Sequence, residues 1–157
     1  MKVVQKSILS ESEKRIIWQL RNNEYPLQFG SKTFQEFEMY LEKLIDLKHF
    51  FLFDQKNEII GWAFSFFREE ETWFGFMIDN RFQGKGYGTF LLNEMKNNFD
   101  DLNGWVIDHE NDKKLNGEKY KSPLPFYVKN DFKIFSDIRI ENEIISAVKI
   151  NWKNKKI

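Results

Sequence analysis

The fold is decided by residues 73–92, which read WFGFMIDNRFQGKGYGTFLL. An apolar run suited to a buried strand leads into a polar turn, then into a loop with three glycines, and then into an apolar helix face. Gly84, Gly86 and Gly88 allow the backbone to curve closely around a ligand, because glycine adopts positive φ without steric cost. The helix behind them begins with unpaired N–H groups and a partial positive charge, and both attract anions. The stretch therefore predicts a phosphate-binding loop.

The glycine spacing excludes two common phosphate-binding loops. A P-loop requires Gly-Lys followed by Ser or Thr, whereas Lys85 is followed by Gly86. A dinucleotide-binding turn requires Gly-x-Gly-x-x-Gly, and these glycines are spaced two and two. The pattern present is Gln-x-x-Gly-x-Gly, at Gln83, Gly86 and Gly88. The alternative to a ligand site is a glycine-rich turn that serves only the path of the chain.

Together this strand, loop and helix resemble the pyrophosphate loop of the GNAT superfamily of N-acetyltransferases, whose members bind acetyl-CoA there. The resemblance implies that loop N–H groups hold the pyrophosphate and that the strand backbone holds the pantetheine arm like an added strand. It also implies a strand N–H as donor to the acetyl carbonyl. A bulge would separate this strand from residues 105–108 and open the slot. The cofactor-binding residues implied are Phe76, Met77, Ile78, Gln83, Gly84, Lys85, Gly86, Tyr87, Gly88 and Thr89. Lys85 suits either a phosphate contact or simple solvation.

The order of expected elements extends the resemblance to nearly the whole chain. Ser10 with Glu13, and Thr33 with Glu36, have the spacing of helix N-terminal capping boxes. We expect strands at residues 3–8, 50–53, 59–67, 73–78, 105–108, 132–135 and 144–152, helices at 11–22, 34–45, 88–98 and 124–129, and a break at 100–104. No composition shift indicates a second domain, so residues 1–157 are expected to form a single GNAT domain of the α+β (α/β three-layer) class. Its mixed, mostly antiparallel sheet is expected to have about six to seven strands and about four flanking helices.

A second local match lies at residues 125–132, which read PFYVKNDF. It resembles the superfamily's segment of Phe-Tyr, two or three residues, then Gly-Phe, in which the tyrosine is a general acid. The resemblance assigns this role to Tyr127, since a phenol within about 3 Å of the leaving thiolate can protonate it. Asp131 replaces the usual glycine, and Asp tolerates the left-handed conformation better than most residues. The alternative is that Tyr127 only packs beside Phe126.

The general base stays open at this point. A lysine-like amine, with a pKa of about 10.4, requires about 4–5 kcal/mol to lose its proton at neutral pH, and an α-amine only about 1 kcal/mol. Some resembling enzymes carry a glutamate on the fourth or fifth strand, and here Asp108 and His109 end the fifth. Either is a candidate base, although neighbouring strand residues face opposite sides of a sheet. A structural histidine and a water relay without a dedicated base are equally compatible with the sequence.

Residues 111–122 depart from the family pattern. Many relatives have an Asn that contacts the cofactor about seven residues before the tyrosine, and that offset falls on Tyr120 here. We expect this segment to lie over the active site, because loops of this length are often functional.

The acceptor pocket is expected at the first two helices and their connection. Candidate lining residues there are aromatic or acidic: Trp18, Tyr25, Phe29, Phe34, Phe37, Tyr40, Glu24, Glu36 and Glu38. Such a pocket would suit a small amine or a peptide amine, but aromatic residues at helical spacing are equally typical of a core.

Composition argues against several other classes. Twenty-four basic and 24 acidic side chains cancel, so neither nucleic acid nor an acidic membrane is an expected partner. No apolar stretch approaches about 18 residues, and the amino terminus lacks the apolar core of a signal peptide. The absence of cysteine excludes disulfides and a thiolate nucleophile or ligand. We expect a cytoplasmic monomer or homodimer without a metal.

Taken with these observations, the GNAT resemblance implies an N-acetyltransferase that would transfer an acetyl group from acetyl-CoA to a primary amine by direct attack in a ternary complex. Proximity and carbonyl polarisation would supply most of the rate. A covalent acyl-enzyme is not expected, since no cysteine exists and no serine has an evident base. The alternative is a catalytically silent acyl-CoA-binding module that regulates a partner, and turnover distinguishes the two.

Overall fold

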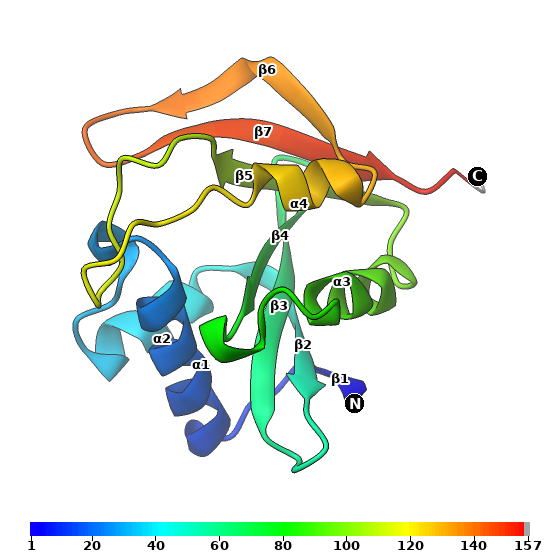
Figure 1. Cartoon of the computed structure of the whole chain (residues 1–157). Coiled ribbons are helices and arrows are strands. Elements are labelled where there is room, and N and C mark those ends of the chain that lie inside the picture. The colour runs from blue at the N-terminus through cyan, green and yellow to red at the C-terminus, as the bar shows by residue number, and fades with distance from the viewer. Residues whose placement is uncertain (156–157) are drawn as a thin grey trace.

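The computed structural model describes residues 1–155, which form one seven-stranded sheet and four α-helices (Figure 1). The strands are β1 (Lys2–Lys6), β2 (Ile45–Phe53), β3 (Ile59–Arg68), β4 (Glu71–Ile78), β5 (Asp101–Ile107), β6 (Lys133–Glu141) and β7 (Ser146–Lys153). The helices are α1 (Glu11–Glu24), α2 (Phe34–Glu42), α3 (Tyr87–Lys96) and α4 (Leu124–Lys129), with short 3-10 turns η1 (Leu27–Phe29) and η2 (Asn80–Phe82). The sheet order is β1-β2-β3-β4-β5-β7-β6, and only β4 and β5 are parallel neighbours. The expected fold class is confirmed.

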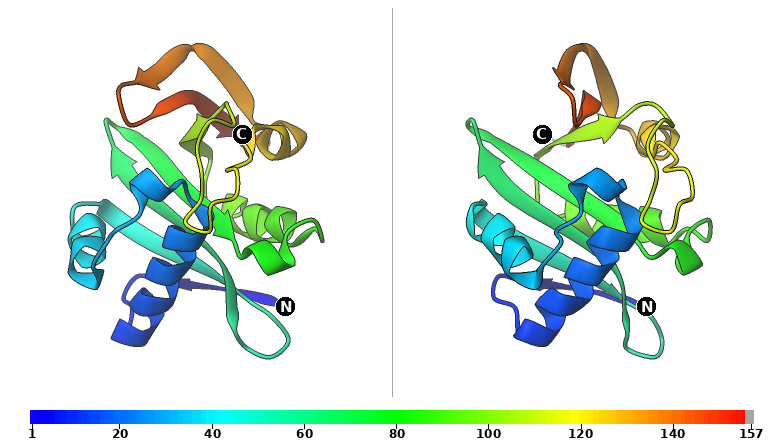
Figure 2. Two further views of the ribbon diagram at one scale, coloured as in Figure 1. Left: turned by 60° about the vertical axis from the view of Figure 1, so that its left-hand side comes forward. Right: turned by 90° about the vertical axis from the view of Figure 1, so that its left-hand side faces the viewer.

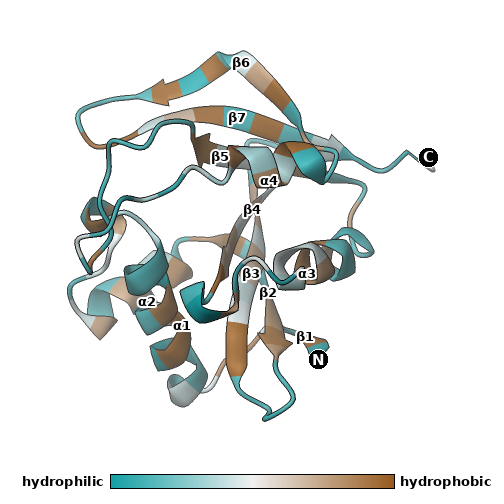
Figure 3. Ribbon diagram, viewed as in Figure 1, coloured by the Kyte–Doolittle hydropathy of each residue, from teal (hydrophilic) through white to brown (hydrophobic). Residues whose placement is uncertain are grey.

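Helices cover both faces of the sheet (Figure 2). Because successive strand residues point to opposite faces, Phe50 and Leu52 of β2 face the core under α3 and α4, while Phe51 between them faces the core under α1 and α2. The central strands are accordingly hydrophobic along their length, and the connections around them are mostly hydrophilic (Figure 3). The domain therefore has two hydrophobic cores, one on each side of the sheet.

Local signals placed the starts of α1 and α2 well, although α2 ends at Glu42, before its predicted end at residue 45. The Ser10 hydroxyl accepts a hydrogen bond from the Glu13 N–H, and the Glu13 carboxylate accepts one from the Ser10 N–H, so the predicted capping box is present. Thr33 caps α2 through the Glu36 N–H. Asp131, at the usual glycine position, has a φ of 71° as expected. Helix starts and this turn depend on neighbouring residues, which a sequence displays directly.

Strand extents were predicted less well. The expected break at residues 100–104 is wrong, because Asp101 begins β5 and Asn103 pairs with Asn151 of β7. The Asn151 amide donates to Asp101 and to Asn103, which satisfies these polar groups inside the sheet. Similarly, β2 begins at Ile45 and β6 continues to Glu141, beyond the predicted ends. These residues are in strands because they pair with distant strands, which the local sequence does not indicate.

The sheet opens between its two parallel strands. β4 and β5 pair only at Trp73 and Asn103, and beyond that point they separate. The predicted bulge is not what separates them, because β4 keeps an unbroken register with β3 from Arg68–Glu71 to Gly61–Ile78. Near the point where β4 and β5 pair, the ring of Phe74 lies against Gly104. A Cβ at position 104 would be 2.8 Å from a carbon of that ring. Divergence of β5 thus leaves one edge of β4 unpaired in the middle of the sheet.

A buried histidine makes stability depend on pH. His49 is 2% exposed, and its Nδ1 accepts a hydrogen bond of 3.0 Å from the Trp62 indole. Burial lowers the pKa of His49 from 6.5 to about 4, so the folded protein binds this proton less readily than the unfolded chain does. We expect the free energy of unfolding to fall as pH drops from about 6.5 to about 4, with roughly 3 kcal/mol due to His49.

Urea unfolding across that pH range measures this effect. His49→Leu should remove most of the dependence between pH 6.5 and 4, whereas His109→Leu, at the chain's other histidine, should retain it. An unchanged slope in His49→Leu would show that other groups cause the loss of stability in acid.

Candidate functional site

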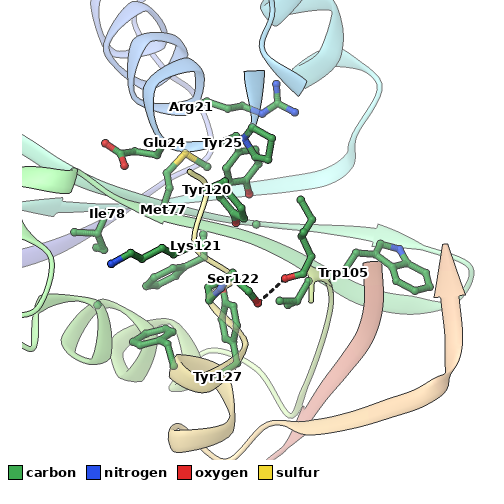
Figure 4. Close-up of a pocket in the computed structure, with 18 of the residues that line it drawn as sticks. Arg21, Glu24, Tyr25, Met77, Ile78, Trp105, Tyr120, Lys121, Ser122 and Tyr127 are labelled. Carbon is green, nitrogen blue, oxygen red and sulfur yellow. Dashed lines mark hydrogen bonds between the residues drawn. The ribbon is translucent and has the colours of Figure 1, made fainter. Parts of the chain in front are cut away.

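A cavity of about 860 Å³ occupies the opening between β4 and β5, a volume typical of small-molecule sites. Its walls come from the end of α1, from β3, β4 and β5, from the loop before α3, from α4 and from residues 118–123. Figure 4 shows labelled lining side chains from the end of α1, β4, β5, residues 120–122 and α4 around a common space. The gap in the sheet is thus the place where elements distant in sequence meet.

The glycine loop borders this cavity. Gly84 and Gly86 have φ values of 76° and 84°, the left-handed region that strains other residues. Gly86 is the N-cap of α3 and provides no side-chain cap. Within residues 1–155, no protein acceptor bonds the first-turn N–H groups of Tyr87, Gly88 and Thr89. Unpaired N–H groups at a helix N-terminus suit an anionic group such as a diphosphate.

Most of the residues predicted to bind the cofactor line the cavity: Phe76, Met77, Ile78, Gln83, Gly84, Gly86, Gly88 and Thr89. Lys85 and Tyr87 lie outside the lining. Lys85 is exposed with its Nζ 6.0 Å from the Phe82 ring, and the Tyr87 ring packs on Phe82 at 6.2 Å. Of the two uses open to Lys85, the geometry favours solvation.

The unpaired edge of β4 presents a backbone donor at its centre. Because β5 has diverged, no β5 residue pairs with Phe76, whose N–H lies close to the Tyr25 hydroxyl. Burial raises the pKa of Tyr25 to about 12, and the Arg21 charge and the nearby Phe76 N–H oppose that shift. A carbonyl oxygen that replaced the Tyr25 hydroxyl would accept the same N–H, which is the geometry of an oxyanion donor.

Three phenols share this part of the cavity. Tyr127 is 5% exposed, and its ring packs on Phe74, Phe76 and Phe132 with centroids 5.3–6.3 Å apart. Burial raises the pKa of Tyr127 well above its ordinary value, with smaller contributions from Tyr25 and Tyr120, and burial likewise raises the pKa of Tyr120. All three remain protonated near neutral pH, and each can donate a hydrogen bond.

Neither candidate base reaches the cavity lining. Arg139 bonds both oxygens of Asp108, at 2.7 and 3.0 Å, and so lowers the pKa of that carboxyl. His109 accepts the Asn111 N–H at 3.1 Å, and its Nε2 lies 3.9 Å from Asp112. β5 ends at Ile107, so the chain leaves the sheet before both residues. The geometry therefore gives no support to a base at position 108 or 109.

Residues 111–122 lie across the cavity, as expected. They form a hairpin in which Lys113 pairs with Lys119, and the Leu27 N–H bonds the Lys113 carbonyl at 2.8 Å. At its end the Ser122 hydroxyl donates to the Ile107 carbonyl at 2.6 Å, the dashed bond in Figure 4. The hairpin thus bridges the end of β5 and the turn after α1.

An ion pair fastens this hairpin to α1. The Lys114 ammonium lies 3.1 Å from the Glu24 carboxylate, and both side chains are largely buried. Glu24 also accepts the Asn80 N–H at 3.0 Å, and the Gln83 amide donates to the Ile78 carbonyl at 2.9 Å. Glu24, expected as an anion for the acceptor, is therefore already occupied by protein donors.

Sequence comparison gives the family. The sequence model described as the acetyltransferase (GNAT) domain matches residues 46–134, which include the glycine loop, the diverging strands and α4. The chain belongs to the GNAT acetyltransferase family. No curated protein matches the sequence.

Solved GNAT structures share the fold at low identity. An aminoglycoside 6'-N-acetyltransferase complexed with coenzyme A is 14% identical, with a TM-score of 0.73 over 98% of this chain and 97% of that one. Spermidine N-acetyltransferase from Vibrio cholerae, in complex with CoA and spermine, is 17% identical, with a TM-score of 0.67 over 98% and 96%. A phosphinothricin acetyltransferase from Sinorhizobium meliloti, in complex with AcCoA, is 13% identical, with a TM-score of 0.64 over 98% and 89%.

Of the residues predicted to line an acceptor pocket, only some line the cavity. Tyr25, Phe29, Tyr40 and Glu24 line the cavity. The other residues expected there serve the fold. Phe37 is in the core, the Trp18 indole donates to the Ser31 carbonyl, and the Phe34 ring contacts the tilted ring of Trp18 and the Arg15 guanidinium. Glu36 accepts the Lys32 N–H, and Glu38 pairs with Lys14. Lining residues that the sequence analysis missed are Arg21, Phe64, Phe66, Arg68, Trp73 and Trp105. For Arg21 a signal existed, because it precedes Tyr25 by one helical turn.

Among the described residues, no helix has the length and apolarity that a membrane crossing requires. Nor does any cluster of three or more His, Asp or Glu side chains in residues 1–155 form a candidate metal site.

Proposed function

We propose that this chain is an N-acetyltransferase that uses acetyl-CoA to acetylate a primary amine by direct attack in a ternary complex, with residues 1–157 acting as a single domain. The supporting observation is one continuous cavity. It extends from the unpaired N–H groups at the start of α3, along the open edge of β4, to Tyr127. A GNAT site must bind the diphosphate of acetyl-CoA as an anion and hold the extended pantetheine arm like a strand. It also needs a phenol near the thioester at the end of that arm.

The glycine loop and β4 bind different parts of acetyl-CoA. N–H groups of residues 84–89 hold the diphosphate, and the backbone of Phe76, Met77 and Ile78 binds the pantetheine arm where β5 has left it unpaired. The Phe76 N–H then polarises the acetyl carbonyl, which requires the Tyr25 hydroxyl to move aside. Each of these contacts uses backbone groups, so the sequence needs glycine and strand residues more than particular side chains.

The transfer step forms a C–N bond and breaks a C–S bond. The amine nitrogen attacks the thioester carbonyl carbon, and the sulfur leaves with the bonding electron pair. The nitrogen loses its proton to water, and Tyr127 is the general acid, whose hydroxyl donates its proton to the departing sulfur. Burial raises the pKa of Tyr127, so the phenol keeps its proton until negative charge develops on the sulfur. Water returns the proton from nitrogen to the Tyr127 oxygen, so Asp108 and His109 have no direct part.

A thiol-release assay with acetyl-CoA and a panel of amines tests this function. The chain has no cysteine, so the protein contributes no thiol background. Release of CoA that depends on an amine supports the transferase. If CoA binds but no amine in the panel releases thiol, the site is an acyl-CoA-binding regulatory module instead.

A further inference from the structure

One buried cation in the cavity lacks an acidic partner. Arg21 lies in the last turn of α1, is 9% exposed and lines the cavity. Its Nη1 donates to the Phe29 carbonyl at 2.9 Å. Its Nε is buried without a hydrogen-bond partner, the one such side-chain atom among residues 1–155, and no carboxylate in that part of the chain forms an ion pair with Arg21.

Aromatic rings hold the Arg21 guanidinium without satisfying its donors. Its Cζ lies 4.3 Å from the centre of the Tyr40 ring and 5.5 Å from that of Tyr25. Ring faces attract a cation, but they provide no hydrogen-bond acceptor for the unpaired Nε. A buried charge with open donors is costly unless a partner pairs with it. A carboxylate is the partner whose geometry fits the planar fork of arginine.

The cavity's own acids do not supply that partner. The Glu24 carboxylate is bound to Lys114 and to the Asn80 N–H, and Glu118 lies on the exposed part of the hairpin. Other lining cations are Arg68, Lys119, Lys121 and Lys129. The lining thus carries an excess of positive charge, which disfavours an acceptor with several amines and favours one with an anionic group.

Arg21 lies near the acyl position rather than near the phosphate loop. Its neighbour Tyr25 reaches the centre of the β4 edge at the Phe76 N–H, whereas the N–H groups suited to a diphosphate are at residues 84–89. A group bound to Arg21 therefore belongs to the acceptor.

We propose that Arg21 binds a carboxylate of the acceptor, so that the acceptor is a primary amine with a carboxylate on the same molecule. The aromatic walls formed by Tyr25, Phe29, Tyr40 and Phe66 suit an apolar body on that amino acid. This inference rests on the proposed acetyltransferase function and specifies its acceptor class.

Matched substrate pairs test the inference. We would measure kcat/KM for α-amino acids and ω-amino acids of increasing length, apolar and aromatic ones included, each beside its own carboxamide. Spermidine and an aminoglycoside would represent acceptors with several amines. The wild-type protein should prefer at least one acid over its amide by about tenfold or more, through KM.

Substitution at Arg21 should abolish that preference. In Arg21→Met the ratio of kcat/KM between acid and amide should fall to about one, and Arg21→Lys should retain part of it. The ratio does not depend on how much of the variant folds, and the Kd of CoA checks the cofactor site. The matched control is Arg15→Met, because Arg15 also lies on α1 with its Cζ 4.1 Å from a ring, that of Phe34, but outside the cavity lining.

The possible results distinguish failure of the acceptor class from failure of the proposed acetyltransferase function. If no amine releases thiol, the acetyltransferase proposal fails, and this inference fails with it. If amines are acetylated but acids and amides react equally, or spermidine or the aminoglycoside is preferred, the function stands and the acceptor class is wrong. An equal loss for acid and amide in Arg21→Met would assign Arg21 a purely structural role.

Discussion

Replacing Gly86 with aspartate should raise the Kd of CoA by about 100-fold and leave the fold intact. Aspartate tolerates left-handed backbone, as Asp131 does in this chain, and its carboxylate can cap the first N–H groups of α3. Those N–H groups would then bond the aspartate and no longer the diphosphate, and the aspartate charge would repel the diphosphate. At about 5 Å and an effective dielectric constant of about 20, one such charge pair costs about 3 kcal/mol. Calorimetric titration with CoA measures the loss.

Gly117→Asp is the matched control. Gly117 has a φ of 85°, and a Cβ there would meet open space, as at Gly86. Its substitution imposes a similar backbone strain in the hairpin, away from α3, and should change the Kd of CoA by less than about threefold. Equal effects of the two substitutions would mean that the start of α3 does not hold the diphosphate.

Tyr127→Phe should lower kcat by about 100-fold with little change in the Kd of CoA. Only the hydroxyl is removed, and the ring keeps its contacts with Phe74, Phe76 and Phe132. The hydroxyl interacts most strongly with the sulfur as the sulfur becomes a thiolate in the transition state. Its loss therefore lowers kcat more than it raises the Kd of CoA. Steady-state thiol release, beside CoA titration, separates the two quantities.

Tyr127→Ala separates the hydroxyl from the ring. It removes a buried aromatic side chain and should lower the free energy of unfolding by about 3–5 kcal/mol, whereas Tyr127→Phe should retain stability near that of the wild type. An unchanged kcat in Tyr127→Phe would show that Tyr127 only packs in the core.

The loop proposed to bind the cofactor was predictable as a local structure because it depends on backbone conformation in consecutive residues. A strand, a left-handed glycine pair and a helix start are encoded within residues 73–92, and Gly84 and Gly86 have the expected positive φ values. Lys85 and Tyr87 were named with them only because they share the loop, and neither residue lines the cavity.

The part of the cavity proposed for the acceptor was not predictable in the same way. Whether Arg21, Phe34 or Phe37 faces the cavity depends on how α1 and α2 pack on β3 and β4, and helical spacing alone does not determine that. Asp108 and His109 were reasonable candidates until the end of β5 at Ile107 placed them outside the cavity lining.

The sequence by itself determined the local events: the caps at Ser10 and Thr33, the glycine loop, and the turn at Asp131. Each depends on hydrogen bonds and φ preferences within a few residues. Only the tertiary structure decided that Asp101 begins a strand, that β5 leaves β4 after a single pair, and that Arg21 is buried without an acid. Those features depend on contacts between residues far apart in the chain. A short stretch of sequence does not show the energies of such contacts.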